Sequence, residues 1–192
     1  MNDNRRQALG DVLVFALLVA IGVAGRWGQP EWCFTPTAAA AIFAGRYFSR
    51  LTVAAMVPLA ILAISDLLLP AYDNLAVMVA TYGVMTFPVA LGKWLGVGAA
   101  SRWGTALRWA TCGLVPATAF FLVSNFAVWA FQSNYEKSWA GLVTCYGMAV
   151  PFFRWMLAGD LFYLAILFAC GALAGLPLPQ SSQLQRQPVA GR

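Results

Sequence analysis

The sequence predicts an all-α integral membrane protein, a bundle of about six transmembrane helices. Of its 192 residues, 61% are hydrophobic and only 10% are charged, whereas about a quarter of the residues of a soluble domain are charged. A span needs about 20 mostly apolar residues, so this length accommodates one compact bundle and no sizeable soluble domain. We expect one membrane-embedded domain over residues 1–175, followed by a disordered cytoplasmic tail rich in Pro, Gln and Ser over 176–192.

Apolar stretches define the expected helices. The first follows a basic start and resembles a signal peptide, but we expect an uncleaved span because Arg26 and Trp27 close it and an even number of spans follows. The second has eleven residues, which cross a bilayer only if the helix borrows flanking residues or the bilayer thins; a re-entrant hairpin is the alternative. In chain order the stretches are 9–24, 37–47, 51–69, 75–95, 107–130 and 151–174.

Most basic residues fall at every second connection between the predicted spans, and therefore on one side of this bundle. They stand singly at the ends of apolar runs instead of clustering on one polar face, so no nucleic acid is expected as a partner. Because cytoplasmic loops carry the excess of Lys and Arg, both termini are predicted to be cytoplasmic and the protein to lie in a bacterial inner membrane. The residues on the predicted cytoplasmic side are Arg5, Arg6, Arg46, Arg50, Lys93, Arg102, Arg108, Arg186 and Arg192.

Signatures of catalysis are absent from the sequence. It contains no histidine, which removes the usual general base, most zinc sites and every Ser-His or Cys-His pair. No Walker A, Rossmann or G-x-S-x-G pattern occurs either. We expect no enzyme, no cofactor and no metal site, and any ATP hydrolysis would belong to another subunit.

Polar side chains inside the apolar runs predict a binding pocket. Ionisable groups at membrane depth are costly enough to indicate function, and on the predicted topology all of them fall in the outer half: Asp66, Tyr82, Asn125, Arg154 and Asp160. The alternative is a structural salt bridge between Arg154 and either Asp66 or Asp160. Arg154 and Asp160 are six residues apart and point about 120° away from each other on one helix. We therefore expect Asp66 to pair with Arg154, and Tyr82 or Asn125 with Asp160.

Two outer loops, 25–36 and 131–150, mix Trp and Tyr with polar residues. Such residues form interfacial belts or cover a ligand, and for the second role we name Trp27, Trp32 and Tyr135. These loops also hold Cys33 and Cys145, whose shared side of the membrane permits a disulfide or a soft metal contact.

Prolines and small residues recur within the runs. Pro58, Pro88 and Pro116 each free a carbonyl one turn earlier, as in the broken helices of transporters. Small residues repeat at helical spacing, for example at Ala40 and Ala44 and at Gly92 and Gly96, and such faces let helices pack closely.

The segment 124–168 carries a resemblance. Its SNFAVW, YEKSWAGL, CY, PFFR and GDLFY elements, together with FTPTAAAAIFAGRYF and SDLLLP nearer the N-terminus, resemble a family of uncharacterised bacterial inner-membrane proteins over about 34–171. That family in turn resembles the S components of energy-coupling-factor (ECF) vitamin importers. The resemblance implies a six-helix subunit that captures a small molecule at the outer face, alone or with a transmembrane coupling subunit and ATPases.

These observations predict a membrane-embedded substrate-binding component for uptake of a small, vitamin-like molecule. Arg154 would meet an anionic or carbonyl group, and Asp66 and Asp160 a cation or hydroxyl. The alternative is a non-transporting membrane scaffold or assembly factor whose buried charges are structural.

Overall fold

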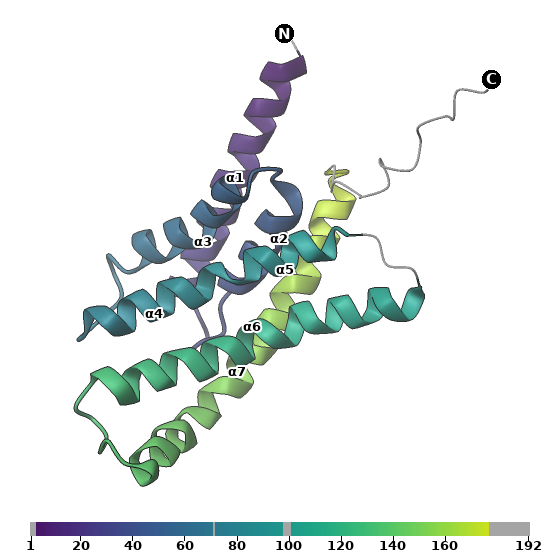
Figure 1. Ribbon diagram of the computed structural model, residues 1–192. Helices are drawn as coiled ribbons and strands as arrows, with labels where there is room; N and C mark the ends of the chain where they lie inside the picture. Colours follow the sequence, from purple (N-terminus) through teal and green to yellow (C-terminus); the bar gives the residue numbers. More distant parts are fainter. Residues whose placement is uncertain (1–2, 71, 98–100, 177–192) are drawn as a thin grey trace, which may run out of the picture.

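The computed structural model describes residues 3–70, 72–97 and 101–176, and this part of the chain contains helices and no strand (Figure 1). The tail predicted over 176–192 lies outside the described residues from 177 onward. The helices are α1 (Asp3–Trp27), α2 (Thr37–Tyr47), α3 (Leu51–Ser65), α4 (Leu75–Thr86), α5 (Pro88–Leu95), α6 (Arg102–Phe131) and α7 (Trp139–Leu173).

Four helical stretches are long and apolar enough to cross a membrane: Arg5–Trp27, Leu75–Leu95, Arg102–Phe131 and Trp139–Leu173. The third of the predicted stretches forms a shorter apolar helix, Leu51–Ser65. The stretch Leu75–Leu95 comprises α4 and α5, which follow one another directly around Phe87, a residue with helical φ and ψ. Pro88 lacks the N–H of a regular helix at this point, and the division into two segments falls there. The all-helical class is confirmed for the described residues, and four of the helical stretches could cross a membrane by length and composition.

The short second stretch forms the centre of the bundle. Every residue of α2 from Thr37 to Gly45 is buried, and α1, α3, α5 and α7 pack around it. A helix that is apolar on all sides is stable only when other elements surround it. Eleven residues extend about 16 Å, so α2 is shorter than a bilayer is thick and its neighbours cover it.

Glycines allow α2 and α5 to touch backbone to backbone. A Cβ at Gly92 would lie 2.0 Å from the carbonyl oxygen of Ile42, and one at Gly45 would lie 2.1 Å from that of Val89. Ala40 and Ala44 on α2 are fully buried. The prediction that small residues form packing faces is confirmed at these positions.

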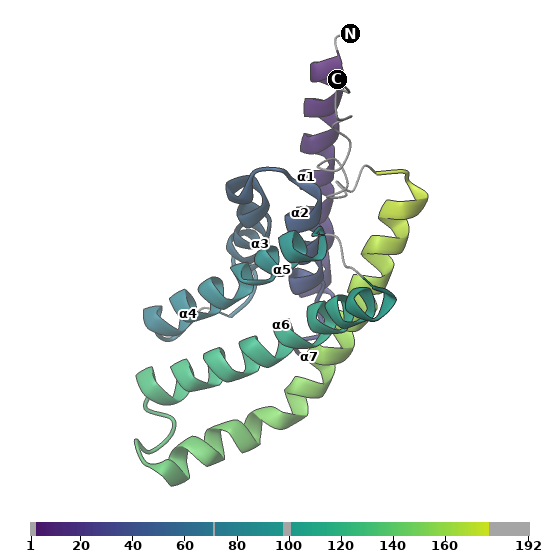
Figure 2. The ribbon, with the colours of Figure 1, turned by 45° about the vertical axis from the view of Figure 1, so that its right-hand side comes forward.

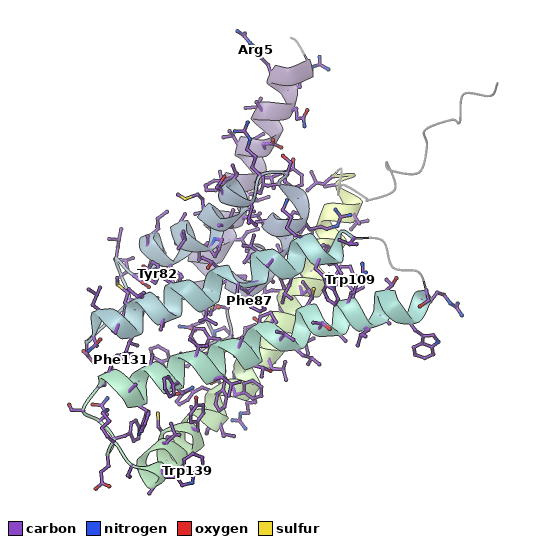
Figure 3. The ribbon with its side chains drawn as sticks, viewed as in Figure 1. Arg5, Tyr82, Phe87, Trp109, Phe131 and Trp139 are labelled. Atoms are coloured by element: carbon purple, nitrogen blue, oxygen red, sulfur yellow. The ribbon has the colours of Figure 1, made fainter. Side chains whose placement is uncertain are left out.

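The last two helices form a long hairpin that extends beyond the other elements (Figure 2). The connecting turn is only 132–138, and Phe131 and Trp139 stand at its two sides (Figure 3). The prediction of an outer loop over 131–150 and a helix from residue 151 was therefore wrong. Ser138 caps α7 by accepting a hydrogen bond from the Gly141 N–H, and Pro151 lies inside the helix without ending it.

Contacts between helix ends define two ends of the molecule. At one end, the Asn74 Nδ2 donates to the Phe131 carbonyl at 2.9 Å, which joins the start of α4 to the end of α6. At the other, the Lys93 Nζ donates to the Ser49 carbonyl at 2.9 Å, which joins the end of α5 to the turn between α2 and α3. Consecutive helical stretches thus alternate in direction when α4 and α5 are taken as one (Figure 1).

Candidate functional site

A cavity of about 300 Å³ lies between α1, α2, α3, α4, α6 and α7 and the loop 28–36. Ligand sites in proteins are typically mostly apolar clefts of about 300–1,000 Å³ with a few placed polar groups, and this cavity meets that description at the lower end. Its apolar lining includes Leu62, Val84, Met85, Phe120 and Met156, and its polar lining includes Arg26, Gln29, Thr35, Thr37, Asp66, Tyr72, Thr81 and Asp160.

An ion pair occupies the part of the cavity wall formed by α1 and α3. The Arg26 Nη2 lies 3.0 Å from the Asp66 Oδ1, and both side chains are partly buried. The Arg26 Nη1 also donates to the Ser65 Oγ at 2.7 Å. The Tyr82 hydroxyl on α4 (Figure 3) donates to the Asp66 Oδ2 at 2.8 Å. Asp66 therefore has two partners, and the network joins α1, α3 and α4.

The partner of Asp66 is thus Arg26, and the predicted Arg154–Asp66 pair was wrong. Sequence reasoning placed Arg26 at the outer end of the first span and did not include it among the pocket residues. The signal that could have identified Arg26 as the partner was its position in the last turn of α1. This position is at the same predicted membrane depth as the end of the third apolar stretch, where Asp66 lies.

Asp160 lies in the cavity wall on α7 and is only 5% exposed. Its Oδ2 is buried and has no hydrogen-bond partner among the described residues, and the backbone of Ala117 in α6 lies close to the carboxyl group. The neighbouring Gly159 allows the loop to approach, since a Cβ there would lie 3.1 Å from the Thr35 backbone nitrogen. The cavity wall therefore contains a buried carboxyl group, one oxygen of which is satisfied by no protein group in the described residues.

The predicted partners of Asp160 are engaged elsewhere. Tyr82 binds Asp66, and the Asn125 Nδ2 donates to the Phe121 carbonyl of its own helix at 2.8 Å. Asn125 does not line the described cavity. Both pairings predicted for Asp160 were wrong.

Arg154 lies away from the cavity. Its side chain is exposed, and its guanidinium carbon lies 5.2 Å from the ring centroid of Trp155. The reason is geometric: Asp160 faces the cavity, and a residue six positions earlier on the same helix points about 120° away from it.

The three aromatic residues predicted to cover a ligand take different positions. Trp32 lines the cavity and is 61% exposed, as a residue at a cavity mouth would be. Trp27 donates its Nε1 hydrogen to the Ser65 carbonyl at 3.0 Å and so supports the wall from outside. Tyr135 lies in the turn of the α6–α7 hairpin and is not among the lining residues that the structure describes.

Cys33 contributes to the lining from a left-handed backbone conformation, φ 71°. Its thiol is free, as is that of Cys145, whose Sγ lies 3.4 Å from the Asn125 carbonyl oxygen in the hairpin. The disulfide considered for these residues is therefore absent from the structure. Burial raises the pKa of the Cys33 thiol, and burial together with the nearby Asp66 carboxylate raises the pKa of Tyr72, so both groups are neutral hydrogen-bonding groups near neutral pH.

A family model matches residues 6–182, nearly the whole chain. The chain belongs to DUF6580, a family of unknown function. No curated protein and no solved structure matches the DUF6580 chain, so these comparisons give the resemblance to S components no support. The cavity geometry is therefore the main guide to the function of this DUF6580 protein.

Proposed function

We propose that this DUF6580 protein is a membrane-embedded binding component for uptake of a small molecule, with its site in the cavity between α1, α3, α4 and α7. The observation that carries the proposal is the buried carboxyl group of Asp160, a residue that lines the cavity and whose Oδ2 has no hydrogen-bond partner in the described chain. Buried polar atoms are nearly always satisfied, and an exception calls for an explanation. A bound ligand supplies the missing partner.

The cavity wall favours binding over a purely structural role. Leaving a buried polar group without a partner destabilises a protein by about 1–3 kcal/mol, so a scaffold gains nothing from Asp160 at this position. The Arg26–Asp66 pair is different, because its members are mutually satisfied and also bound to Ser65 and Tyr82. That network is what the alternative function, a membrane scaffold or assembly factor, would need.

The proposed topology has six membrane crossings, two of them made by the short helices α2 and α3, with both termini in the cytoplasm of a bacterial inner membrane. Alternating helix directions and the alternating basic residues support it. In this topology the cavity faces the cell exterior, since it lies beside the loop 28–36 and the segment that follows α3. By resemblance to S components, a transmembrane coupling subunit and ATPases would supply energy, because this chain has no Walker A motif.

Two valine variants on the same helix test the proposal. Val84 lines the cavity, whereas Val79 is 60% exposed on the outer surface of α4. Wild-type protein and both tryptophan variants are purified from membranes in mild detergent, and bound small molecules are identified by mass spectrometry. We expect one compound to accompany wild-type protein and Val79→Trp and to be absent from Val84→Trp, which places a much larger side chain in the cavity.

Failure would take either of two forms. Wild-type protein that carries no small molecule, or Val84→Trp that retains the compound while folded, would contradict a binding role. Once the compound is identified, its accumulation in cells that produce wild-type protein or Val84→Trp separates transport from binding without transport.

A further inference from the structure

We infer that the ligand carries a protonated amine that binds the Asp160 carboxylate. This inference rests on the proposed function, because it assigns a chemical class to the occupant of the same cavity. It follows from three features of the cavity: its charge, the geometry of its acceptors and its apolar lining.

The first feature is charge. The lining contains two carboxylates, Asp66 and Asp160, and one cation among the residues described, Arg26. Arg26 is bound to Asp66 at 3.0 Å and to Ser65, so its charge is already matched. Asp160 is the remaining acidic group, and no described cation of the lining is paired with it. Because a buried carboxylate is stable only beside an opposite charge, a bound cation favours the ionised form and a second anion does not.

The second feature is the set of hydrogen-bond acceptors. An ammonium group has three donors and no acceptor, and the Asp160 Oδ2 is an acceptor without a partner in the described residues. Thr35, Thr37 and Thr81 line the same cavity, and a hydroxyl oxygen can accept more than one hydrogen bond. Thr37 is 1% exposed, so its hydroxyl belongs to the interior of the site.

The third feature limits the rest of the ligand. Leu62, Val84, Phe120 and Met156 line the cavity, and apolar walls favour a hydrocarbon or aromatic body. The volume of about 300 Å³ is at the small end of ligand sites. The expected class is therefore a small amine with a compact apolar body, as distinct from an amino acid, whose carboxylate would lie near Asp160.

Three probes of matched shape test this inference: 2-phenylethylamine, 2-phenylethanol and 3-phenylpropionate. Each is added to purified, ligand-free protein in nanodiscs, and the melting temperature is measured as a function of concentration. Because a ligand stabilises the state it binds, we expect the amine to raise the melting temperature of wild-type protein. The alcohol and the acid should require roughly tenfold higher concentration or more, since they lack the charge-assisted hydrogen bond.

Variants locate the effect at Asp160. Asp160→Asn keeps the shape of the side chain and should weaken the amine's effect by roughly 10-fold to 100-fold. Asp73→Asn is the matched control, because Asp73 is an exposed carboxylate that does not line the cavity, and it should respond to the amine as wild-type protein does. The comparison of three probes on wild-type protein does not depend on whether a variant folds.

The inference is overturned if the amine gives no stabilisation, if the alcohol or acid matches it, or if Asp160→Asn responds as wild-type protein does. If the alcohol or the acid stabilises wild-type protein and Val84→Trp abolishes that effect, the inference of an amine is overturned. The proposal that the cavity binds a small molecule would still stand. The binding proposal fails separately, when wild-type protein purifies with no small molecule.

Discussion

Replacing Asp160 with asparagine should stabilise the ligand-free protein, the opposite of what removing a buried charge usually does. The side chain is 5% exposed and its Oδ2 has no hydrogen-bond partner in the part of the chain that the structure describes. An unsatisfied buried group destabilises a protein by about 1–3 kcal/mol, and an amide avoids the additional cost of ionising a buried carboxyl group. We expect the free energy of unfolding to rise by about 1–2 kcal/mol. The increase is less than the full penalty because the amide also keeps some unsatisfied hydrogen-bonding capacity.

The assay is thermal unfolding of ligand-free protein in detergent at neutral pH. For a chain of this size a gain of 1 kcal/mol raises the melting temperature by about 2–4 °C, so Asp160→Asn should melt roughly 2–8 °C above wild-type protein. Asp66→Asn is the contrasting variant, because it leaves Arg26 without its counter-ion. Loss of one member of a fully buried ion pair lowers the free energy of unfolding by about 3–5 kcal/mol. The Arg26 and Asp66 side chains are 15% and 17% exposed, so we expect a smaller decrease of about 1–3 kcal/mol. Equal destabilisation of both variants would refute the reasoning, since Asp160 would then be a satisfied structural group.

Three further predictions concern packing, chemistry and topology. Gly92→Ala should abolish most folded, monodisperse protein in size-exclusion chromatography, because its Cβ would lie 2.0 Å from a backbone oxygen of α2. Gly83→Ala is the control and should keep its yield, because Gly83 has open space around it. Equal yields of the two variants would contradict the close contact. Cys33 should react with a maleimide more slowly than an exposed thiol near pH 7, and its reaction should become faster as pH rises. The reason is that burial raises the pKa of the thiol and the thiolate is the nucleophile. Rapid labelling at neutral pH would show that the thiol is not buried. Reporters fused after residue 175 should read cytoplasmic and one within 132–137 external, and a cytoplasmic signal from 132–137 would refute the six-span order.

Composition and apolar runs predicted the helical membrane class because they depend on local sequence alone. Most predicted helices appear within a few residues of their expected positions, for example 75–95 as Leu75–Leu95. The burial of α2 could also have been predicted from the sequence, since TAAAAIFAG offers no polar face to water and few bulky side chains to lipid. Its short length was instead interpreted as a weak span.

The site was predicted only in part, for geometric reasons. Asp66, Asp160 and Trp32 line the cavity, but the partner of Asp66 depends on how α1 packs against α3, which no local pattern records. The start of α7 was misplaced because the sixth apolar stretch was begun at residue 151, although the Ser138 cap was visible in the sequence. Arg154 was misplaced because depth along the helix was considered without the direction of the side chain, although the 120° angle to Asp160 was known.

An experimental structure of the protein purified in nanodiscs without added ligand tests the central claim most directly. The account predicts non-protein density in the cavity, with a polar atom within hydrogen-bond distance of the Asp160 Oδ2 and away from the satisfied Arg26–Asp66 pair. A cavity filled by a lipid acyl chain, or an Asp160 Oδ2 bound by a protein group with no ligand present, would contradict it.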